Sequence, residues 1–170
     1  MKLQTLEAIF RTLNEAGVRY LVVGGLAVNV HGYQRLTNDL DLVIQLGRDN
    51  ILAAFQALSS LGYQTSVPIT PEQFACAENR QKWQAEKNMQ VLCLVSNQHP
   101  ETPLDIFITE PFDFDREYAA ALRGGIAKGL EVRFVTIPTL IAMKESAGRE
   151  RDRDDIQHLR WILEELEKND

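Results

Sequence analysis

The sequence predicts an α/β (α+β) fold, a mixed β-sheet flanked by helices, with further helices at the C-terminus. Two observations predict it. Short apolar segments bounded by glycines or polar residues alternate with longer amphipathic segments along the chain. The 170 residues, 45% hydrophobic and 25% charged, also suit one globular domain. We therefore expect residues 1–170 to form a single domain, in which residues 138–170 are its C-terminal helical part.

The first third of the chain predicts three helices and two strands. The helices are expected over residues 3–16, 26–31 and 49–61, and the strands over "VRYLVVGG" and residues 39–45. Gly17 and Gly62 are natural helix stops, and Asp49 or Asn50 can cap the third helix.

The rest of the chain predicts three strands and three helices. Residues 66–88 contain two prolines and a polar run, which predicts a loop with one or two helical turns. The strands "MQVLCLVS" and "PLDIFIT" are separated by a polar loop, which suggests a hairpin. The remaining elements are a helix at 113–123 stopped by Gly124 and Gly125, the strand "LEVRFVT", a helix from Pro138 to Gly148, and a last amphipathic helix over 151–167.

Charge and composition exclude several classes of function. A net charge of −6 argues against a general nucleic-acid-binding face. A large nucleic acid is therefore not a favoured partner, although a local basic patch could reverse this; its candidate residues are Arg35, Lys82, Lys87, Lys144 and Arg149. Two cysteines make neither a disulfide framework nor a zinc signature. No signal peptide or apolar run of about 20 residues is seen, so we expect a cytoplasmic protein without a membrane segment.

Three carboxylates are candidates for a metal site. In an extended strand Asp39 and Asp41 share one face, about 6.5 to 7 Å apart. Such a pair requires compensation, which Mg²⁺ supplies through oxygen ligands and substrate phosphates. Asp105 is an acid inside the apolar strand "PLDIFIT". If the two strands are neighbours, the three carboxylates could hold two metal ions about 3.5 to 4 Å apart and activate a hydroxyl.

Gly24 and Gly25 are candidates for phosphate binding. They lie between a predicted strand and a predicted helix, where glycine lets the backbone approach a phosphate closely. The pair is neither a P-loop nor a dinucleotide fingerprint, because no Gly-Lys-Ser/Thr and no Gly-x-Gly-x-x-Gly is present. Asp-x-Asp also occurs in haloacid-type phosphatases, but there it ends a buried strand, whereas the polar "YQRLTN" precedes it here.

The glycine pair, Asp39-Leu40-Asp41 and Asp105 together resemble the nucleotidyltransferase superfamily of DNA polymerase β-like fold. "GGLAVNVHGYQRLTNDLDL" is most similar to small bacterial members related to aminoglycoside nucleotidyltransferases and abortive-infection nucleotidyltransferase toxins, with Arg35 and Thr37 matching the intermediate segment. "IPTLIAMKESAGRERDRDDIQHL" resembles the closing helices of the family, including Lys144. The resemblance runs from about residue 18 to about residue 160.

The resemblance implies roles for these residues. Asp39 and Asp41 would be metal ligands, Asp105 would complete the metal site and activate the acceptor, and Gly24 and Gly25 would hold phosphates. Many members have serine as the second residue of the pair, with its hydroxyl on a phosphate; Gly25 leaves only backbone contacts.

Two basic residues are further candidates for binding the nucleotide. Arg35 either contacts a phosphate or pairs with a surface acid. Lys144 either contacts the triphosphate or extends its ammonium group from an apolar helix face to solvent. The charge run "RERDRDD" predicts a solvated face, within which Asp152 and Asp155 pin the last helix.

The implied activity is Mg²⁺-dependent transfer of a nucleoside monophosphate from a nucleoside triphosphate such as ATP to an acceptor hydroxyl. Two Mg²⁺ ions are expected. The acceptor is open: a small molecule, a tRNA end or a protein hydroxyl. A homodimer or a partner protein could complete the site. The alternative is a non-catalytic module of the same fold, a nucleotide sensor or the partner of a toxin in a toxin-antitoxin pair.

Overall fold

The computed structural model describes residues 1–169, in which helices and strands alternate. In chain order they are α1 (Leu3–Glu15), β1 (Tyr20–Val23), α2 (Gly24–Val30), β2 (Leu40–Ile44), α3 (Arg48–Ser60), β3 (Tyr63–Thr65), α4 (Pro71–Ala75), α5 (Ala77–Lys87), β4 (Val91–Ser96), β5 (Leu104–Phe107), α6 (Phe114–Ala120), β6 (Leu122–Ala127), β7 (Leu130–Phe134), α7 (Ile137–Ala147) and α8 (Asp152–Asn169).

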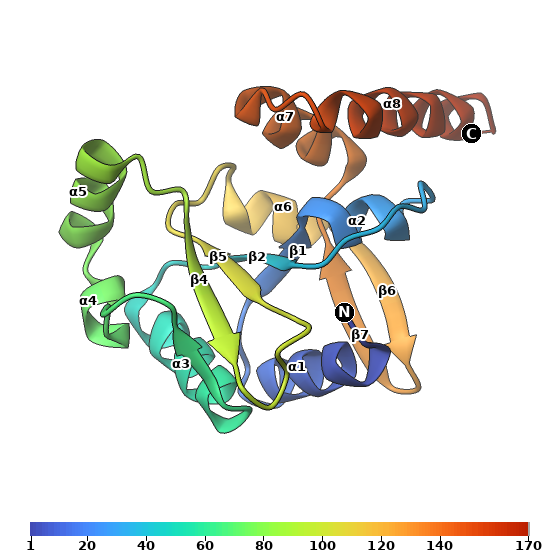
Figure 1. The fold of residues 1–170 in the computed structure, drawn as a ribbon. Helices are drawn as coiled ribbons and strands as arrows, with labels where there is room; N and C mark the ends of the chain where they lie inside the picture. The colour runs from blue at the N-terminus through green and yellow to red at the C-terminus, as the bar shows by residue number, and fades with distance from the viewer. Residues whose placement is uncertain (170) are drawn as a thin grey trace.

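The strands form one seven-stranded mixed sheet in the order β3-β4-β5-β2-β1-β7-β6 (Figure 1). The β1–β7 and β2–β5 pairs are parallel, and the other neighbours are antiparallel. The predicted α/β class with a mixed sheet is therefore confirmed. The predicted hairpin of β4 and β5 and the proximity of the two acid-bearing strands, β2 and β5, are also confirmed.

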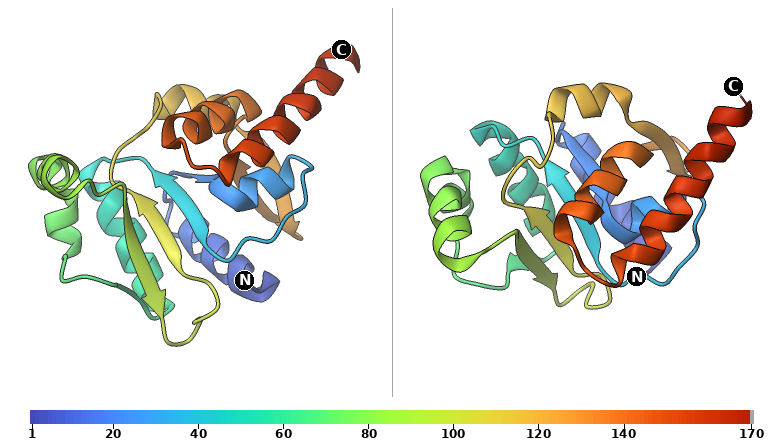
Figure 2. Two further views of the ribbon diagram at one scale, coloured as in Figure 1. Left: turned by 45° about the horizontal axis from the view of Figure 1, so that its top comes forward. Right: turned by 90° about the horizontal axis from the view of Figure 1, so that it is seen from above.

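Helices cover both faces of the sheet. α1 and α3 lie together below it in Figure 1, whereas α2, α7 and α8 lie above it. Viewed from above, α7 and α8 lie side by side across this upper face, and the last turns of α8 extend beyond the rest of the molecule (Figure 2). The predicted C-terminal helical part is present, and its last residue, Asp170, lies outside the described residues.

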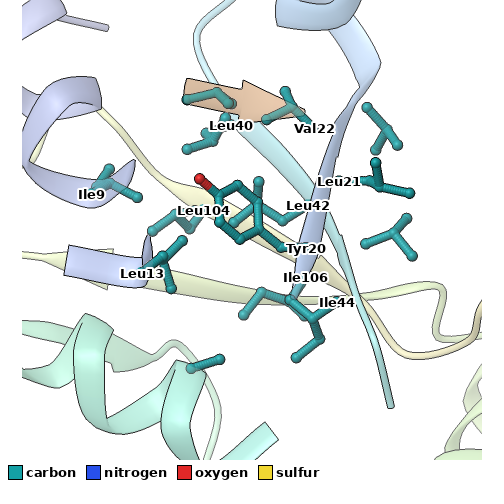
Figure 3. Close-up of a cluster of buried hydrophobic side chains, with 14 of the residues drawn as sticks. Ile9, Leu13, Tyr20, Leu21, Val22, Leu40, Leu42, Ile44, Leu104 and Ile106 are labelled. Carbon is teal, nitrogen blue, oxygen red and sulfur yellow. The ribbon is translucent and has the colours of Figure 1, made fainter. Parts of the chain in front are cut away.

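The core between the sheet and α1 fixes which way the acidic strands face. Leu40, Leu42, Leu104 and Ile106 are almost fully buried, and they gather with Ile9 and Leu13 of α1, which Figure 3 shows in close-up. Since successive side chains of a strand point to opposite faces, the residues between these leucines and isoleucines face the other side of the sheet. That side is the one covered by α2 and α7.

Three parts of the structure differ in detail from the sequence prediction. Residues 66–88 contain two helices, α4 and α5, rather than a loop with one or two turns. The helix expected over 113–123 ends at Ala120, and Gly124 and Gly125 lie inside strand β6 instead of stopping a helix. The short edge strand β3 was not predicted.

Candidate active site

The two acidic strands place their carboxylates side by side. Asp41 of β2 is the register partner of Asp105 of β5 on one side and of Val23 of β1 on the other. Cys93 of β4 is the register partner of Asp105 on its far side. Neighbouring strands are about 4.8 Å apart, so Asp41 and Asp105 are direct neighbours on the face opposite the α1 core. Asp39 immediately precedes β2, two residues before Asp41.

The glycine pair begins helix α2 directly at the end of β1, beside Asp41. Gly24 has φ +64°, and a Cβ atom at this position would lie 1.9 Å from the Asp41 Oδ2 atom. Only glycine therefore satisfies both the backbone conformation and the space. The backbone N–H of Gly25 is near enough to the Asp41 carboxylate to oppose the rise of its pKa. The strand-to-helix turn predicted from the sequence thus contacts the predicted metal ligand.

A cleft of about 1100 Å³ opens above this part of the sheet. All of the sequence-predicted site residues line it, and they are Gly24, Gly25, Arg35, Asp39, Asp41, Asp105 and Lys144. Lys82 and Lys87, which could have joined a basic patch, are on α5 and are not among the lining residues. The structure therefore brings the candidate residues into one cavity, from segments that lie more than a hundred residues apart in the sequence.

The cleft raises the cost of a negative charge on its acids. Burial, followed by the charges of Asp105 and Asp39, raises the pKa of Asp41 to about 7, against the opposing effects of Lys144 and the Gly25 N–H. Burial and the charge of Asp39 also raise the pKa of Asp105, against a hydrogen bond from Cys93 and the charge of Arg149. A bound cation would relieve both effects.

The carboxylates of the cleft suit a magnesium ion whose coordination is completed by the phosphates of the substrate. Among residues 1–169, no three histidine, cysteine, aspartate or glutamate side chains are gathered closely enough to hold a metal ion by themselves. Mg²⁺ is commonly held by only one or two carboxylates plus substrate phosphates, and it keeps several waters. The adjacent oxygen ligands of Asp41 and Asp105, with no fixed third ligand, suit that mode of binding.

A buried ionic cluster joins α7 and α8 to the loop before β2. The Lys144 ammonium lies 3.1 Å from Asp152 Oδ1 and 2.8 Å from Asp155 Oδ2, and Arg35 Nε lies 2.7 Å from Asp155 Oδ1. The Arg35 contact is an ion pair but not an aligned hydrogen bond. Lys144 does not reach solvent, and Asp152 and Asp155 are buried, so the charge run is not a solvated face throughout. Their expected role in pinning the last helix agrees with these contacts.

Sequence reasoning missed much of the cleft lining. Beyond Asp105, one end is formed by the segment between α5 and β4, the first residue of β4, and the end of β5 with the segment after it. The lining residues of this end that the structure describes are uncharged, and they are Asn88, Gln90, Val91, Phe107, Thr109, Pro111 and Phe112. At the other end Arg149 and Arg151 line the cleft without an ion-pair partner within residues 1–169. The charge run hinted at the two arginines, but no periodic signal pointed to the uncharged end.

This sheet, with an acid pair beside a glycine turn, has the nucleotidyltransferase fold, as comparison with solved structures shows. The structure of the lincosamide antibiotic adenylyltransferase LnuA with bound lincomycin matches with a TM-score of 0.62 and 17% identity, covering 94% of this chain and 96% of that chain.

Two further solved structures have the same fold. ANT(2″)-Ia in complex with adenylyl-2″-tobramycin matches with a TM-score of 0.58 and 13% identity, over 95% of this chain and 88% of that chain. A putative nucleotidyltransferase from Thermotoga maritima matches with a TM-score of 0.56 and 13% identity, over 95% and 92%. No family model and no curated protein sequence matches the chain at a significant level.

Proposed function

We propose that the protein is a Mg²⁺-dependent nucleotidyltransferase that moves a nucleoside monophosphate from a nucleoside triphosphate to an acceptor hydroxyl. The observation that carries the proposal is the pairing of Asp41 with Asp105 directly beside the Gly24 turn, inside one large cleft. A fold shared with nucleotidyltransferases supports it.

The residues have distinct roles in this reaction. Gly24 and Gly25 allow the triphosphate to approach β1 and α2, and Arg35 and Lys144, whose charges are paired with Asp152 and Asp155, line that side of the cleft as candidate contacts for its phosphates. Asp41 and Asp105, with Asp39 beside them, would hold magnesium together with the substrate phosphates, and the bound metal would activate the nucleophile and neutralise the phosphates. Asp105 takes the proton from the acceptor hydroxyl. The new bond joins the acceptor oxygen to the α-phosphorus, and the bond to the β-phosphate breaks, releasing pyrophosphate.

The order of the strands in the sheet indicates the end of the cleft from which the acceptor approaches. Asp105 is farther from the glycine turn than Asp41, and β4 lies beyond it. If the phosphates occupy the side of β1 and α2, the hydroxyl approaches Asp105 from the uncharged end of the cleft, past Phe107 and Phe112. The acceptor itself is left open. A nucleoside triphosphate substrate also agrees with a cytoplasmic location, as expected from composition, and no helix in residues 1–169 is long and apolar enough to cross a membrane.

One observation favours the alternative of a nucleotide-binding module. No three-residue metal cluster is assembled within residues 1–169, and a module that binds nucleotide without magnesium would need none. Such a module could act through a partner protein. The adjacent acids are better explained by a metal-dependent reaction. Burial and neighbouring carboxylates raise the pKa of Asp41 and of Asp105, and their negative charges would be unfavourable in a site that never holds a cation.

The test is transfer of label from α-phosphate-labelled ATP. Reactions would contain Mg²⁺ and either a cell extract or purified acceptors. The purified acceptors would include lincomycin, which is bound in one structural neighbour, and tobramycin, whose adenylyl derivative is bound in another. Asp41→Asn and Asp105→Asn keep the shape of each side chain and should reduce transfer at least about 100-fold, the scale of losing one key electrostatic contact. Asp49→Asn, an exposed aspartate in the first turn of α3, is the matched control.

The outcome separates the two functions. Loss of transfer in both cleft variants, with full activity of Asp49→Asn, supports the enzyme. Full transfer by Asp41→Asn and Asp105→Asn refutes the assignment of these acids. ATP binding without magnesium and without transfer to any acceptor favours the binding module.

A further inference from the structure

The side-chain space of residue 25 is filled from another part of the chain. A Cβ atom on Gly25 would lie 2.4 Å from Thr37 Oγ1, 2.8 Å from Thr37 Cβ and 3.1 Å from Arg35 Nη2. Gly25, unlike Gly24, does not have a positive φ, so backbone conformation does not require glycine here. Lack of space does. Position 25 can only be glycine because Thr37 stands where its side chain would be.

The loop that carries Thr37 is firmly attached to α2 and α8. The Asn29 side chain accepts from the Arg35 backbone N–H at 3.0 Å and donates to the Arg35 carbonyl at 2.9 Å. The Arg35 guanidinium forms its ion pair with buried Asp155 of α8. These contacts hold the loop on both sides of Arg35, so the place of the Thr37 hydroxyl against Gly25 is built into the fold.

The Thr37 hydroxyl remains available to a ligand. Its hydrogen bond within residues 1–169 goes to the Asp39 carbonyl at 3.4 Å, which is longer than the usual range for an O–H···O hydrogen bond. Thr37, Arg35 and Gly25 all line the cleft, next to Asp39 and Asp41. A hydroxyl and a guanidinium group side by side, near carboxylates suited to magnesium, match the chemistry of a metal-bound phosphate.

We propose that Thr37 binds a phosphate of the nucleoside triphosphate through its hydroxyl, and that it occupies the space where a side chain at position 25 would otherwise stand. The proposal rests on the proposed function and adds a substrate-binding residue to it. In the sequence, Gly25 offers a phosphate only backbone contacts. The structure supplies a hydroxyl there from twelve residues further along the chain.

A merely structural role makes a different prediction. If Thr37 only fills space, then its methyl group and volume matter and its hydroxyl does not. Valine, which has nearly the same shape, would then replace it without loss. Serine, which keeps the hydroxyl but loses the methyl, would be the weaker substitute.

The first experiment measures binding of ATP and of inorganic tripolyphosphate, each with Mg²⁺, by calorimetry. Thr37→Val should lower the affinity for both ligands roughly tenfold or more, as expected for the loss of one hydrogen bond to a charged group. The factor should be similar for ATP and for tripolyphosphate, because both carry the phosphates that Thr37 would bind. Thr37→Ser should stay within about twofold of the natural protein. Thr12→Val on α1, across the sheet from the cleft, is the matched control and should bind normally.

The second experiment exchanges the two positions. Gly25→Ser alone places its Cβ against Thr37 and should lower both the melting temperature and ATP binding. Thr37→Ala would not make room, because the Thr37 Cβ is itself 2.8 Å from the new atom; Thr37→Gly does. The double variant Gly25→Ser/Thr37→Gly should therefore bind Mg²⁺-ATP more tightly than Thr37→Gly alone and melt higher than Gly25→Ser alone.

The results distinguish this proposal from the proposed function. If the natural protein binds Mg²⁺-ATP and transfers its nucleotide, but Thr37→Val binds as tightly, the role of Thr37 is refuted and the transferase stands. A double variant whose effects are only the sum of the single variants refutes the shared space. If the natural protein binds neither ATP nor tripolyphosphate, both proposals fail.

Discussion

Asp41 occupies surroundings that suit a neutral carboxylic acid unless a cation is present. Its pKa is raised to about 7 by burial and by Asp105 and Asp39. An aspartate in an unfolded chain has a pKa of about 4. Between these pH values the folded protein holds a proton that the unfolded chain has released, so the free energy of unfolding falls as pH rises through this window.

The pH dependence of stability should therefore report on this residue. In the presence of a chelator, we expect the melting temperature to fall by at least several degrees between pH 5 and pH 8. Asp41→Asn, which cannot ionise, should flatten that decline and melt higher than the natural protein at pH 8. The raised pKa of Asp105 acts in the same direction, so the melting temperature of Asp41→Asn should still fall slightly as pH rises. Identical melting curves for the two proteins across this range would contradict the assignment.

Gly24 can be tested against a glycine with the same backbone conformation. Gly24 has φ +64° and Gly129, in the β6–β7 turn, has φ +73°, but only a Cβ at Gly24 would meet another group, Asp41. Gly129→Ala should cost about 1 to 2 kcal/mol of unfolding free energy and leave ligand binding intact. Gly24→Ala should cost more and abolish stabilisation by Mg²⁺-ATP. Thermal unfolding with and without the ligand measures both, and equal effects of the two changes would refute the close contact.

At the scale of elements, α8 depends on the ionic cluster that joins it to α7. The side chains of Lys144 and Asp155 are 8% and 2% exposed, so removing one partner leaves a charge buried without compensation. We expect Asp155→Ala to lower the free energy of unfolding by about 3 to 5 kcal/mol. Arg35 would also lose its partner, so protection from hydrogen exchange should fall in α8 and in the loop before β2.

An exposed pair on the same segment provides the control. The side chains of Arg153 and Glu150 are 79% and 88% exposed, and Arg153→Ala should change stability by less than about 0.5 kcal/mol. Equal and small effects of the two variants would show that the cluster does not hold α8 in place.

Elements were predictable where local signals agree with tertiary packing. The acid-bearing strands followed from alternation, because Leu40, Leu42, Leu104 and Ile106 all face one core. α5 was missed because its residues are polar on almost every side, with Arg80 its one buried residue, so no apolar stripe marks it. A start signal for α4 was present nevertheless: Thr70 and Gln73 form a capping box around Pro71.

Strand β6 was mistaken for the end of a helix because Gly124, one of its two glycines, is required by a contact with the neighbouring strand. A Cβ on Gly124 would lie 2.9 Å from the ring of Phe134 on β7, so glycine lets this ring lie against the neighbouring strand. A sequence shows the two glycines but not the ring across from them. For the same reason the sequence indicated Gly25 but could not show that Thr37 fills its place.

At the scale of the molecule, the cleft combines two sources of residues. The sheet supplies the acids and the glycine turn, which sequence spacing predicted. The far wall comes from α7, α8 and the segments after α5 and β5, whose positions depend on how the helices dock. Charge order within "RERDRDD" does not reveal that Asp152 and Asp155 turn inward while Arg149 and Arg151 remain exposed in the cleft. The candidate ligands were therefore predictable, and the shape of the cavity was not.

Because the acids are adjacent but form no complete metal site, magnesium and nucleotide should bind as one unit. Each supplies what the other lacks: the metal neutralises Asp41 and Asp105, and the phosphates complete its coordination. Such coupling is reciprocal, so each ligand should raise the affinity for the other by the same factor.

We expect Mg²⁺ alone and ATP alone each to shift the melting temperature by no more than about 1 or 2 °C, and both together to shift it by much more than the sum. Asp41→Asn should remove the excess and leave the shift with ATP alone unchanged. A shift with ATP that does not depend on magnesium would instead identify a binding module, with its acids serving another purpose.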